Sequence, residues 1–290
     1  MTNLSATTYF EEAFSRNIGI LTKDEQKRLA SARVAIPGLG GVGGAHLVAL
    51  ARVGIGKFHI ADFDVFEPVN INRQYGARSS TFGRAKLKVL FHEAKDINPF
   101  LEIETFPEGL SPENLDIFLK GVDVVVDGLD FFAFDIRRML FKRAKALGIP
   151  VITAGPLGFG TALLVFDPEK SPDFDDYFDI RPEMDVVEKI IAFAMGLAPK
   201  GLHLSYIDPE SVDISAQKGP SLSAACFLCA GMATVEVLRI ILGRPGGVRV
   251  PEYVQFDPYK MKFVKGRLRW GNKGPIQRLK MLIAKRWFKK

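Results

Sequence analysis

The chain has 290 residues, of which 47% are hydrophobic and 25% charged, and it contains only two cysteines. This composition is typical of a globular protein with one large core or two domains, and it excludes a disulfide-stapled fold. The net charge is +6, but the cations are concentrated after Lys260, so a general nucleic-acid surface is not supported. The polar N-terminus shows no signal peptide. Because only two cysteines occur, we expect a reducing, cytoplasmic setting.

Strand and helix patterns alternate along the first half of the chain. Apolar segments predict strands at 34–36, 58–61, 101–106, 122–126 and 150–153. Helical patterns lie at 47–53, 84–95 and 135–147, and a further helix is expected to begin at Ser111, with Ser111 as N-cap and Pro112 in the first turn. This alternation predicts an α/β fold, a doubly wound and mostly parallel sheet of the Rossmann-like type.

The pattern changes in the second half, which we expect to add antiparallel strands and a long apolar helix. An apolar strand at 163–166 leads into an acidic, aromatic segment at 173–179 that suits a basic partner or a solvated loop equally well. Predicted elements follow as helices at 184–195 and 222–242, with a polar loop between them that extends to Pro220, and strands at 252–256 and 261–264. The longest apolar stretch, 222–235, is shorter than the roughly twenty residues of a membrane span, so a buried core helix is favoured.

We divide the chain into one domain, 1–270, and a basic tail, 271–290. Within the domain, a helical arm (1–32) precedes a first half (33–160) and a second half (161–270).

A glycine-rich loop with the sequence Gly-Leu-Gly-Gly-Val-Gly separates the first strand from the first helix of the sheet. Its glycines are Gly38, Gly40, Gly41 and Gly43. Glycine permits the tight turn and lets a phosphate approach the backbone at a helix N-terminus, where free N–H groups favour anions. Asp62, at the end of the second strand, stands where dinucleotide folds place a ribose-binding carboxylate. These features alone fit an NAD enzyme equally well.

Polar and cationic residues after Asp62 favour chemistry at phosphorus. The segment 70–74 is Asn-Ile-Asn-Arg-Gln, Lys86 lies near the start of the next helix, and Asp130 follows the buried strand 122–126. Arginine and lysine offset phosphate charge, and a carboxylate can hold magnesium beside a triphosphate. The residues in question are Asn70, Asn72, Arg73, Gln74, Lys86 and Asp130.

With these motifs the sequence resembles the ThiF/MoeB/HesA superfamily, the bacterial relatives of ubiquitin-activating E1 enzymes. The matching pieces are Gly38–Gly43, Asp62-Phe-Asp64, Asn70, Asn72-Arg73-Gln74, Lys86 and Asp130. The resemblance covers about 12–165 well and the later part weakly. It implies that ATP and Mg²⁺ activate a carboxylate as an acyl-adenylate, usually at the C-terminus of a ubiquitin-like sulfur carrier.

The resemblance implies that 1–270 is one adenylation domain, with a nucleotide-binding half (33–160) and a half for substrate and dimer contacts (161–270). It also implies roles for individual residues. Gly41 contacts nucleotide, Asp62 holds ribose, Asn70 and Arg73 hold phosphate, Lys86 bridges phosphates and Asp130 binds Mg²⁺. Arg16 resembles an arginine that family members lend to the ATP of the neighbouring subunit, so a homodimer with shared sites is expected. A carboxylate nucleophile is already ionised and needs no general base, so the four scattered histidines are interpreted as structural.

Two departures from the family pattern bear on metal and thioester chemistry. Relatives with structural zinc carry two Cys-x-x-Cys pairs, whereas this chain has only Cys226 and Cys229, which argues against zinc. Both cysteines are interpreted first as core residues, with a redox or thioester role as the alternative. Phe131 follows Asp130 and lengthens the loop, and either Arg137 or Arg138 replaces an arginine of the family.

The C-terminal segment 275–290 is basic and amphipathic, with Ile276, Leu279, Ile283 and Trp287 on one helical stripe. Such a segment suits an anionic membrane or a partner surface, and a disordered tail or a helix packed on the dimer is the alternative. Membrane binding would place the protein at the inner face of the membrane.

The function expected first is that of an ATP-dependent adenylyltransferase acting on a small carrier protein or a peptide. A variant is the tRNA threonylcarbamoyladenosine dehydratase branch, for which nucleic acid would be the partner. An NAD(P)-dependent oxidoreductase explains the glycines and Asp62 but leaves Arg73, Lys86 and Asp130 without a role. A silent pseudo-enzyme that scaffolds through 222–242 is a further alternative, against which the same three residues argue.

Overall fold

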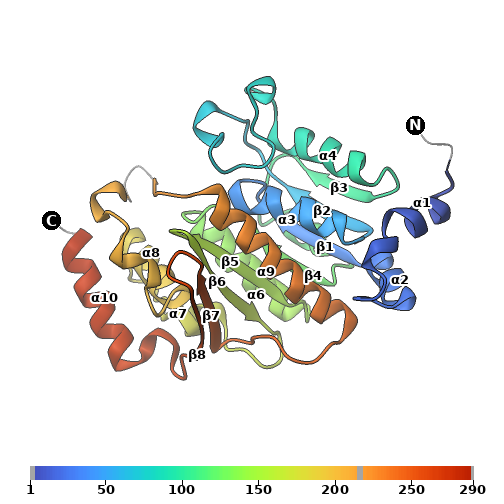
Figure 1. Cartoon of the computed structure of the whole chain (residues 1–290). Coiled ribbons are helices and arrows are strands. Elements are labelled where there is room, and N and C mark those ends of the chain that lie inside the picture. The colour runs from blue at the N-terminus through green and yellow to red at the C-terminus, as the bar shows by residue number, and fades with distance from the viewer. Residues whose placement is uncertain (1–3, 214–217, 289–290) are drawn as a thin grey trace.

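A computed structural model of the chain describes residues 4–213 and 218–288. Within these ranges one sheet of eight strands runs through the molecule in the order β3-β2-β1-β4-β5-β6-β7-β8 (Figure 1). The strands are β1 Arg33–Pro37, β2 Lys57–Ala61, β3 Glu102–Phe106, β4 Val124–Asp127, β5 Val151–Leu157, β6 Gly160–Phe166, β7 Glu252–Asp257 and β8 Lys262–Arg267. β3, β2, β1, β4 and β5 are parallel, and β6, β7 and β8 continue the sheet antiparallel. The predicted fold class is confirmed.

The strand order reverses direction between β1 and β4, which pair through Val34↔Val124 and Ala35↔Val125. After β1 the chain adds β2 and β3 on one side of β1, and it then adds β4 and β5 on the other side. A crevice therefore forms outside the carboxyl ends of these two strands, where doubly wound folds bind their ligands.

Helices cover both faces of the sheet. They are α1 Ala6–Ala13, α2 Lys23–Ser31, α3 Gly41–Arg52, α4 Lys86–Ile97, α5 Leu115–Phe118, α6 Phe134–Ala146, α7 Phe174–Phe178, α8 Val186–Leu197, α9 Ser223–Leu242 and α10 Pro275–Phe288. Side chains from α3, α4 and α9 form one core, and those from α5 to α8 form the other. Consecutive strand residues alternate between the cores, as Val124 and Val125 of β4 show.

α9 is the central helix of the first core, where it packs on α3, β5 and β6. It is long and apolar enough to span a membrane by length and composition, but half of that apolar window is buried inside the protein. Its inward side chains include Cys229, Ala233 and Val237. α9 is therefore a core helix, as the length of its apolar stretch predicted.

The predicted helix at Ser111 begins later than expected. α5 starts at Leu115 and is preceded by Asn114, whose Oδ1 accepts from the Ser111 backbone N–H at 2.8 Å. This side-chain bond to the local backbone closes a turn at Ser111, so the helix begins only after Asn114. Ser111 is therefore not the N-cap of this helix.

The acidic, aromatic segment 173–179 serves the protein's own fold. It contains α7, whose Phe174, Tyr177 and Phe178 are buried at helical spacing. Its carboxylates pair with cations of the same chain, in the pairs Asp173–Lys145, Asp175–Arg138 and Asp176–Lys273. Neither a solvated loop nor an open acidic surface describes it.

Candidate nucleotide-binding site

The glycine loop between β1 and α3 forms the floor of the crevice. Gly38 has φ of +80°, and a Cβ there would lie 2.5 Å from the Gly128 carbonyl oxygen in the loop after β4. A Cβ on Gly43 would lie 1.8 Å from the Gly38 oxygen. Gly38 is therefore required where the two loops touch backbone to backbone, and Gly43 is required where the start of α3 lies against the Gly38 carbonyl.

Gly40 and Gly41 face a more open space. A Cβ on Gly40 would have a single neighbour within 4 Å, the Gln74 side chain at 3.8 Å. At Gly41 it would meet Cys226 Sγ at 3.1 Å and the Arg73 stem at 3.5 Å. α3 begins at Gly41 without a side-chain cap. Its first N–H groups therefore point toward the crevice as anion donors.

Asp62 ties the loop after β2 to the glycine loop. Its Oδ2 accepts from the Leu39 N–H at 2.7 Å and its Oδ1 from the Asp64 N–H at 2.8 Å. Burial raises the pKa of the Asp62 carboxyl, while these two N–H groups act in the opposite direction. Each oxygen retains a second lone pair, so the carboxylate can still accept from ribose hydroxyls.

Lys86 is the first residue of α4 and is buried. Its Nζ lies 2.8 Å from Asp64 Oδ2, and its backbone N–H donates to the Asp64 carbonyl oxygen. A bridge between Val65 and Ala85 holds these two segments together. The ammonium group therefore lies beside the loop that begins with Asp62.

The segment 70–74 surrounds the other side of the glycine loop. Arg73 donates from Nη1 to the Val69 carbonyl oxygen and to Asn72 Oδ1, both at 3.0 Å. Asn72 Nδ2 donates to the Ser221 carbonyl oxygen at 2.9 Å, which joins this segment to the start of α9. Val69 and Asn72 thus fix the orientation of the Arg73 guanidinium, and the aliphatic stem of Arg73 lies beside Gly41.

The two amide side chains on either side of Arg73 differ in their surroundings. Asn70 is buried, and its Oδ1 accepts from the Glu67 N–H, so it shapes the turn that presents Arg73. Gln74 is also buried, and its Oε1 has no hydrogen-bond partner. Because such an atom costs free energy when unpaired, Gln74 is suited to accept a hydrogen bond from a ligand or a water.

Asp130 lies at the carboxyl edge of β4 with its carboxylate exposed. One oxygen accepts from the Phe132 N–H at 2.9 Å. The loop is held from below by Arg137, which donates to the Leu129 and Asp130 carbonyl oxygens at 2.8 and 2.9 Å. Arg138 instead pairs with Asp175. Of the two arginines considered from the sequence, Arg137 is the one at the site.

Sequence reasoning missed the buried partner of Arg137. Asp127, the last residue of β4, pairs with the Arg137 Nε at 2.9 Å. The sequence did contain a signal for this pair: Asp127 ends a buried strand and stands ten residues before an arginine of the next helix.

Arg16 is not part of this site. It lies exposed in the turn Ser15–Asn17, and Asn17 Nδ2 donates to the carbonyl oxygen of Val53, the C-cap of α3. α3 has 12 residues, about 18 Å of helix. Arg16 therefore lies near the end of α3 opposite to the glycine loop.

Both thiols are buried in α9. Burial raises the pKa of the Cys226 thiol and that of Cys229, and Cys229 Sγ lies 3.0 Å from Thr161 Oγ1. Raised thiol pKa values suit packing rather than nucleophilic chemistry. In the described part of the chain no three His, Cys, Asp or Glu side chains gather as a metal site.

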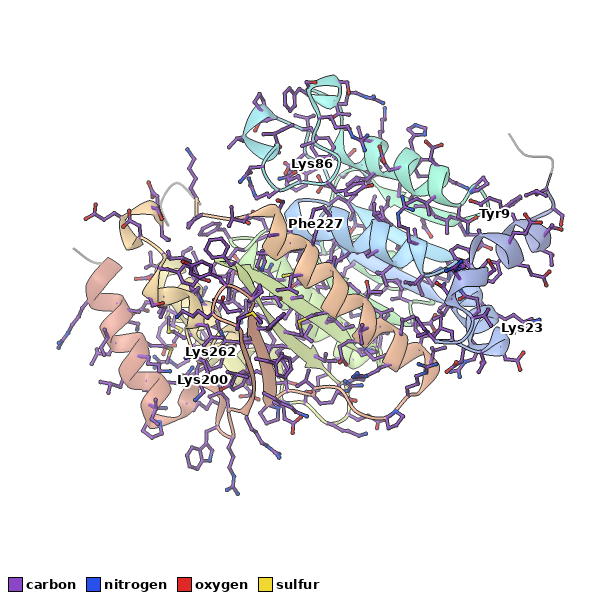
Figure 2. All side chains as sticks on the ribbon, in the orientation of Figure 1. Tyr9, Lys23, Lys86, Lys200, Phe227 and Lys262 are labelled. Carbon is purple, nitrogen blue, oxygen red and sulfur yellow. The ribbon has the colours of Figure 1, made fainter. Side chains whose placement is uncertain are left out.

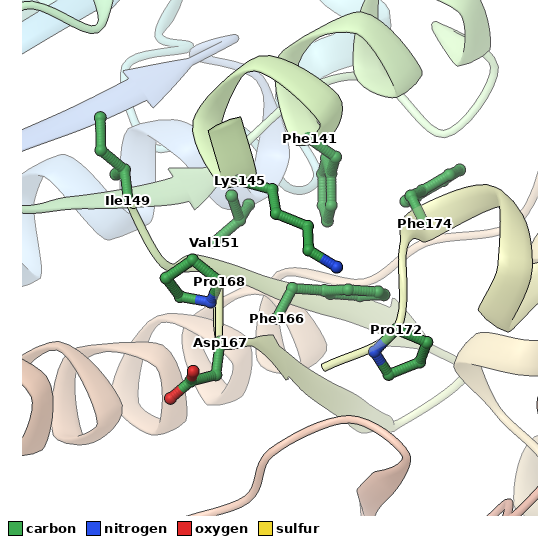
Figure 3. A pocket seen from close by; sticks show the side chains of 9 residues that line it. All are labelled: Phe141, Lys145, Ile149, Val151, Phe166, Asp167, Pro168, Pro172 and Phe174. Carbon is green, nitrogen blue, oxygen red and sulfur yellow. The ribbon is translucent and has the colours of Figure 1, made fainter. Parts of the chain in front are cut away.

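Neither His59 nor His46 is hydrogen-bonded to a crevice residue. His59 contacts the Phe118 carbonyl oxygen and Glu104. His46 is fully buried in α3 with neither ring nitrogen bonded. The cavity shown in Figure 3 is also separate, since it lies near the amino end of β5, and its volume of about 10 Å³ admits at most one water.

Comparison with known proteins decides the family. The family model described as "ThiF family" matches residues 14–274. The chain belongs to the ThiF family. The resemblance inferred from its motifs is confirmed.

Several relatives of this ThiF-family chain have curated names. The tRNA threonylcarbamoyladenosine dehydratase of Haemophilus influenzae is 36% identical over 51% of this chain and 57% of its own length. A probable adenylyltransferase/sulfurtransferase MoeZ of Mycobacterium tuberculosis is 29% identical over 86% of this chain and 58% of its own. This ThiF-family chain thus spans little more than half the length of these relatives.

Solved structures share the fold. PaaA superposes with a TM-score of 0.67 at 21% identity, covering 92% of this chain and 76% of PaaA. Escherichia coli MccB with ATP superposes with a TM-score of 0.62 at 19% identity, covering 84% and 66%.

Proposed function

We propose that this ThiF-family protein is an ATP-dependent adenylyltransferase that activates a carboxylate as an acyl-adenylate. The observation that carries the proposal is the set of charges around the glycine loop. Uncapped N–H groups of α3, the Arg73 guanidinium and the Lys86 ammonium converge on one crevice, with Asp62 and Asp130 at its edges. A hydride-transfer enzyme has no need of two such cations beside the phosphate loop.

The donor set fits ATP and Mg²⁺. The glycine loop and Arg73 would hold phosphate oxygens. Lys86, beside the loop that begins with Asp62, would neutralise phosphate charge, and Asp62 would accept hydrogen bonds from the ribose hydroxyls. Mg²⁺ is usually held by one or two carboxylates together with substrate phosphates, and exposed Asp130 supplies such a carboxylate. The magnesium would neutralise phosphate charge when bound. Zinc has no part in this proposal.

The protein's own contribution is alignment and cationic stabilisation. A carboxylate attacks the α-phosphorus as an ionised nucleophile, the bond from the α-phosphorus to the bridging oxygen breaks, and pyrophosphate leaves. The approach of the carboxylate is opposed chiefly by phosphate charge. Arg73 is held by Val69 and Asn72 before the nucleotide arrives, so little reorganisation is needed at the moment of reaction. No acid–base pair is required, and the histidines remain structural.

The acceptor we propose is the C-terminal carboxylate of a small carrier protein or a peptide in the cytoplasm. One relative is named sulfur carrier protein ThiS adenylyltransferase, of Escherichia coli. MccB has been solved in complex with N-formylated MccA. These names support a carrier protein or a peptide as the acceptor. The division of the domain into a nucleotide-binding half (33–160) and a substrate half (161–270) is part of the same proposal.

A second candidate is a dehydratase-type adenylation of a carboxylate on tRNA. The 36% identity to tRNA threonylcarbamoyladenosine dehydratase over half the chain favours it. Nucleic acid is proposed as a partner only in this case.

We further propose a homodimer in which Arg16 serves the partner's site. α9 has 20 residues, about 30 Å of helix. Its first turns lie at this site, because Ser221 accepts from Asn72 and Cys226 contacts Gly41. Its C-terminal end lies at the Arg16 segment, because Arg244 beyond it donates to the Ile20 carbonyl oxygen.

An exposed stripe on α9 suits such a dimer. Phe227 and Val235 are exposed, and Gly231 between them has open space at its Cβ position. If two copies pack α9 antiparallel about a two-fold axis near Gly231, each Arg16 reaches the partner's Arg73. Figure 1 shows α9 crossing the molecule toward α2, and Figure 2 places Phe227 on its first half.

The deciding experiment measures nucleotide choice and reaction together. We expect ATP with Mg²⁺ to raise the thermal midpoint and NADH to leave it unchanged. We also expect ATP–pyrophosphate exchange that depends on an added carrier or peptide carboxylate, with an amidated C-terminus as control. Stabilisation by NADH alone would instead identify an oxidoreductase.

A further inference from the structure

α10 is a basic amphipathic helix at the end of the molecule opposite to α1 (Figure 1). It is anchored to the body by one face. Gln277 Nε2 donates to the Met195 carbonyl oxygen at 2.9 Å, Met281 is buried, and Lys285 pairs with Glu188 of α8 at 2.8 Å. The helix is thus neither a loose tail nor one that needs a partner to form.

The opposite face of α10 leaves an apolar stripe in solvent. The exposed fractions are 70% for Ile276, 58% for Leu279, 50% for Leu282 and 51% for Ile283. These positions follow helical spacing, so their side chains share one outward face. The fourth residue predicted for the stripe, Trp287, has a side chain outside the described part of the structure.

The charge on α10 itself has one sign, although Asp179 and Glu188 of the body lie beside Arg278 and Leu282. From position 258 to the C-terminus, the sequence contains Lys and Arg but no Asp or Glu. Arg278 and Arg286 belong to α10 itself, while Lys280 and Lys285 are bonded to the body through Pro199 and Glu188. A second copy placed on this face would bring like charges together, which disfavours self-association.

We propose that the outer face of α10 docks the protein on an anionic membrane surface. The apolar stripe would enter the boundary between headgroups and acyl chains, and the arginines would contact anionic headgroups. An apolar face flanked by the exposed Arg278 and Arg286 matches a lipid interface in both respects. The proposal does not depend on the reaction performed in the nucleotide crevice.

Vesicle sedimentation with the full-length protein tests this surface. We expect binding to vesicles of phosphatidylcholine mixed with phosphatidylglycerol and little binding to phosphatidylcholine alone. Raising the salt should weaken binding, because the Debye length falls from about 10 Å at 0.1 M to about 3 Å at 1 M. Absence of binding, or equal binding to both vesicles, would overturn the proposal.

Two pairs of variants separate the stripe from general surface effects. Leu279→Asp with Ile283→Asp should weaken vesicle binding by about tenfold or more, whereas Ile117→Asp, at a 54% exposed residue of α5, should leave it unchanged. Arg278→Gln with Arg286→Gln should cost roughly fivefold per charge. Its control is Lys120→Gln with Lys142→Gln, at two exposed lysines elsewhere.

All variants should keep the wild-type thermal midpoint, because the changed side chains are exposed. Equal losses in a control and its test variant would contradict the assignment. A change in oligomeric state by light scattering, caused by the stripe variant and without loss of vesicle binding, would show that the stripe joins proteins instead.

Discussion

The guanidinium of Arg137 lies 2.9 Å from the carboxylate of Asp127, and both side chains are almost completely buried. The same guanidinium donates to two carbonyl oxygens of the loop that presents Asp130 and lies 4.9 Å from the Phe193 ring centre. The position of Asp130, which is exposed, therefore depends on an ion pair beneath it.

Removing one partner of this pair should destabilise the fold strongly. Arg137→Met leaves Asp127 buried and unpaired, which should lower the free energy of unfolding by about 3–5 kcal/mol. Arg138→Met, which breaks a half-buried pair formed by the same helix, should cost less, about 1 kcal/mol. Urea unfolding measures both. Equal effects would contradict the role of burial, and adding Asp127→Leu to Arg137→Met should recover much of the loss.

Arg73→Ala and Asp130→Ala should each lower carboxylate-dependent pyrophosphate exchange by about two orders of magnitude or more, because each removes preorganised charge from the crevice. Arg52→Ala, at an exposed position near the far end of α3, is the control. Thermal unfolding should be unchanged in all three. Exchange near the wild-type rate in both site variants would end the adenylation proposal.

Arg16→Ala should be inactive alone but complementary to Asp130→Ala. In a mixed dimer, the Arg16→Ala subunit keeps its own Asp130 and receives Arg16 from its partner, so one of its two sites is complete. An equal mixture should therefore recover about a quarter of the wild-type exchange rate. Mass spectrometry of tagged subunits checks that mixing occurred. Mixed dimers without activity would argue against a shared site.

His46 should make stability depend on pH. Burial lowers its pKa to about 3 from an ordinary value of 6.5, so between these values the unfolded chain binds one more proton than the folded chain. The free energy of unfolding should therefore fall as the pH decreases through this window, by about 1.4 kcal/mol per pH unit at most.

The variant His46→Leu removes this dependence and the two unbonded ring nitrogens. It should show a shallower decline of stability from pH 6.5 downward, measured by urea unfolding at several pH values. His92→Leu, at an exposed histidine of α4, should keep the wild-type slope. Parallel curves for wild type and His46→Leu would refute the assignment.

The two cysteines should resist alkylation in the folded state. Both are buried and burial raises both pKa values, so little thiolate is present at neutral pH. Iodoacetamide labelling followed by mass spectrometry should modify both thiols in denaturant and neither in buffer. Rapid native labelling of Cys226 would revive the thioester alternative.

Much of the first half of the sheet, β1 to β5, could be predicted from local pattern. A buried parallel strand is a short apolar run, and Val124–Val126 can be recognised without knowledge of its neighbours. The glycine loop is partly local, because Gly38 has a positive φ and Gly43 lies against the Gly38 carbonyl in the same turn, although Gly38 also lies against the loop after β4. Since parallel strands end at one edge, the polar residues after them were predicted to meet.

Contacts between distant segments could not be predicted in this way. The choice of Arg137 over Arg138 depends on which side of α6 faces Asp127, and the pairing of α7 with Lys145, Arg138 and Lys273 depends on the docking of α6 and η6 (Gly271–Lys273). The start of α5 at Leu115 was decided by the side chain of Asn114, which bonds the local backbone.

The sequence by itself determined the family, the doubly wound sheet and the residues gathered at its carboxyl edge, because strand periodicity and glycine conformation are local properties of the chain. Only the tertiary structure decided which arginine supports the Asp130 loop, where Arg16 lies relative to α9, and which face of α10 remains outside. These depend on packing between segments far apart in sequence, where small differences in orientation select one of two neighbouring side chains.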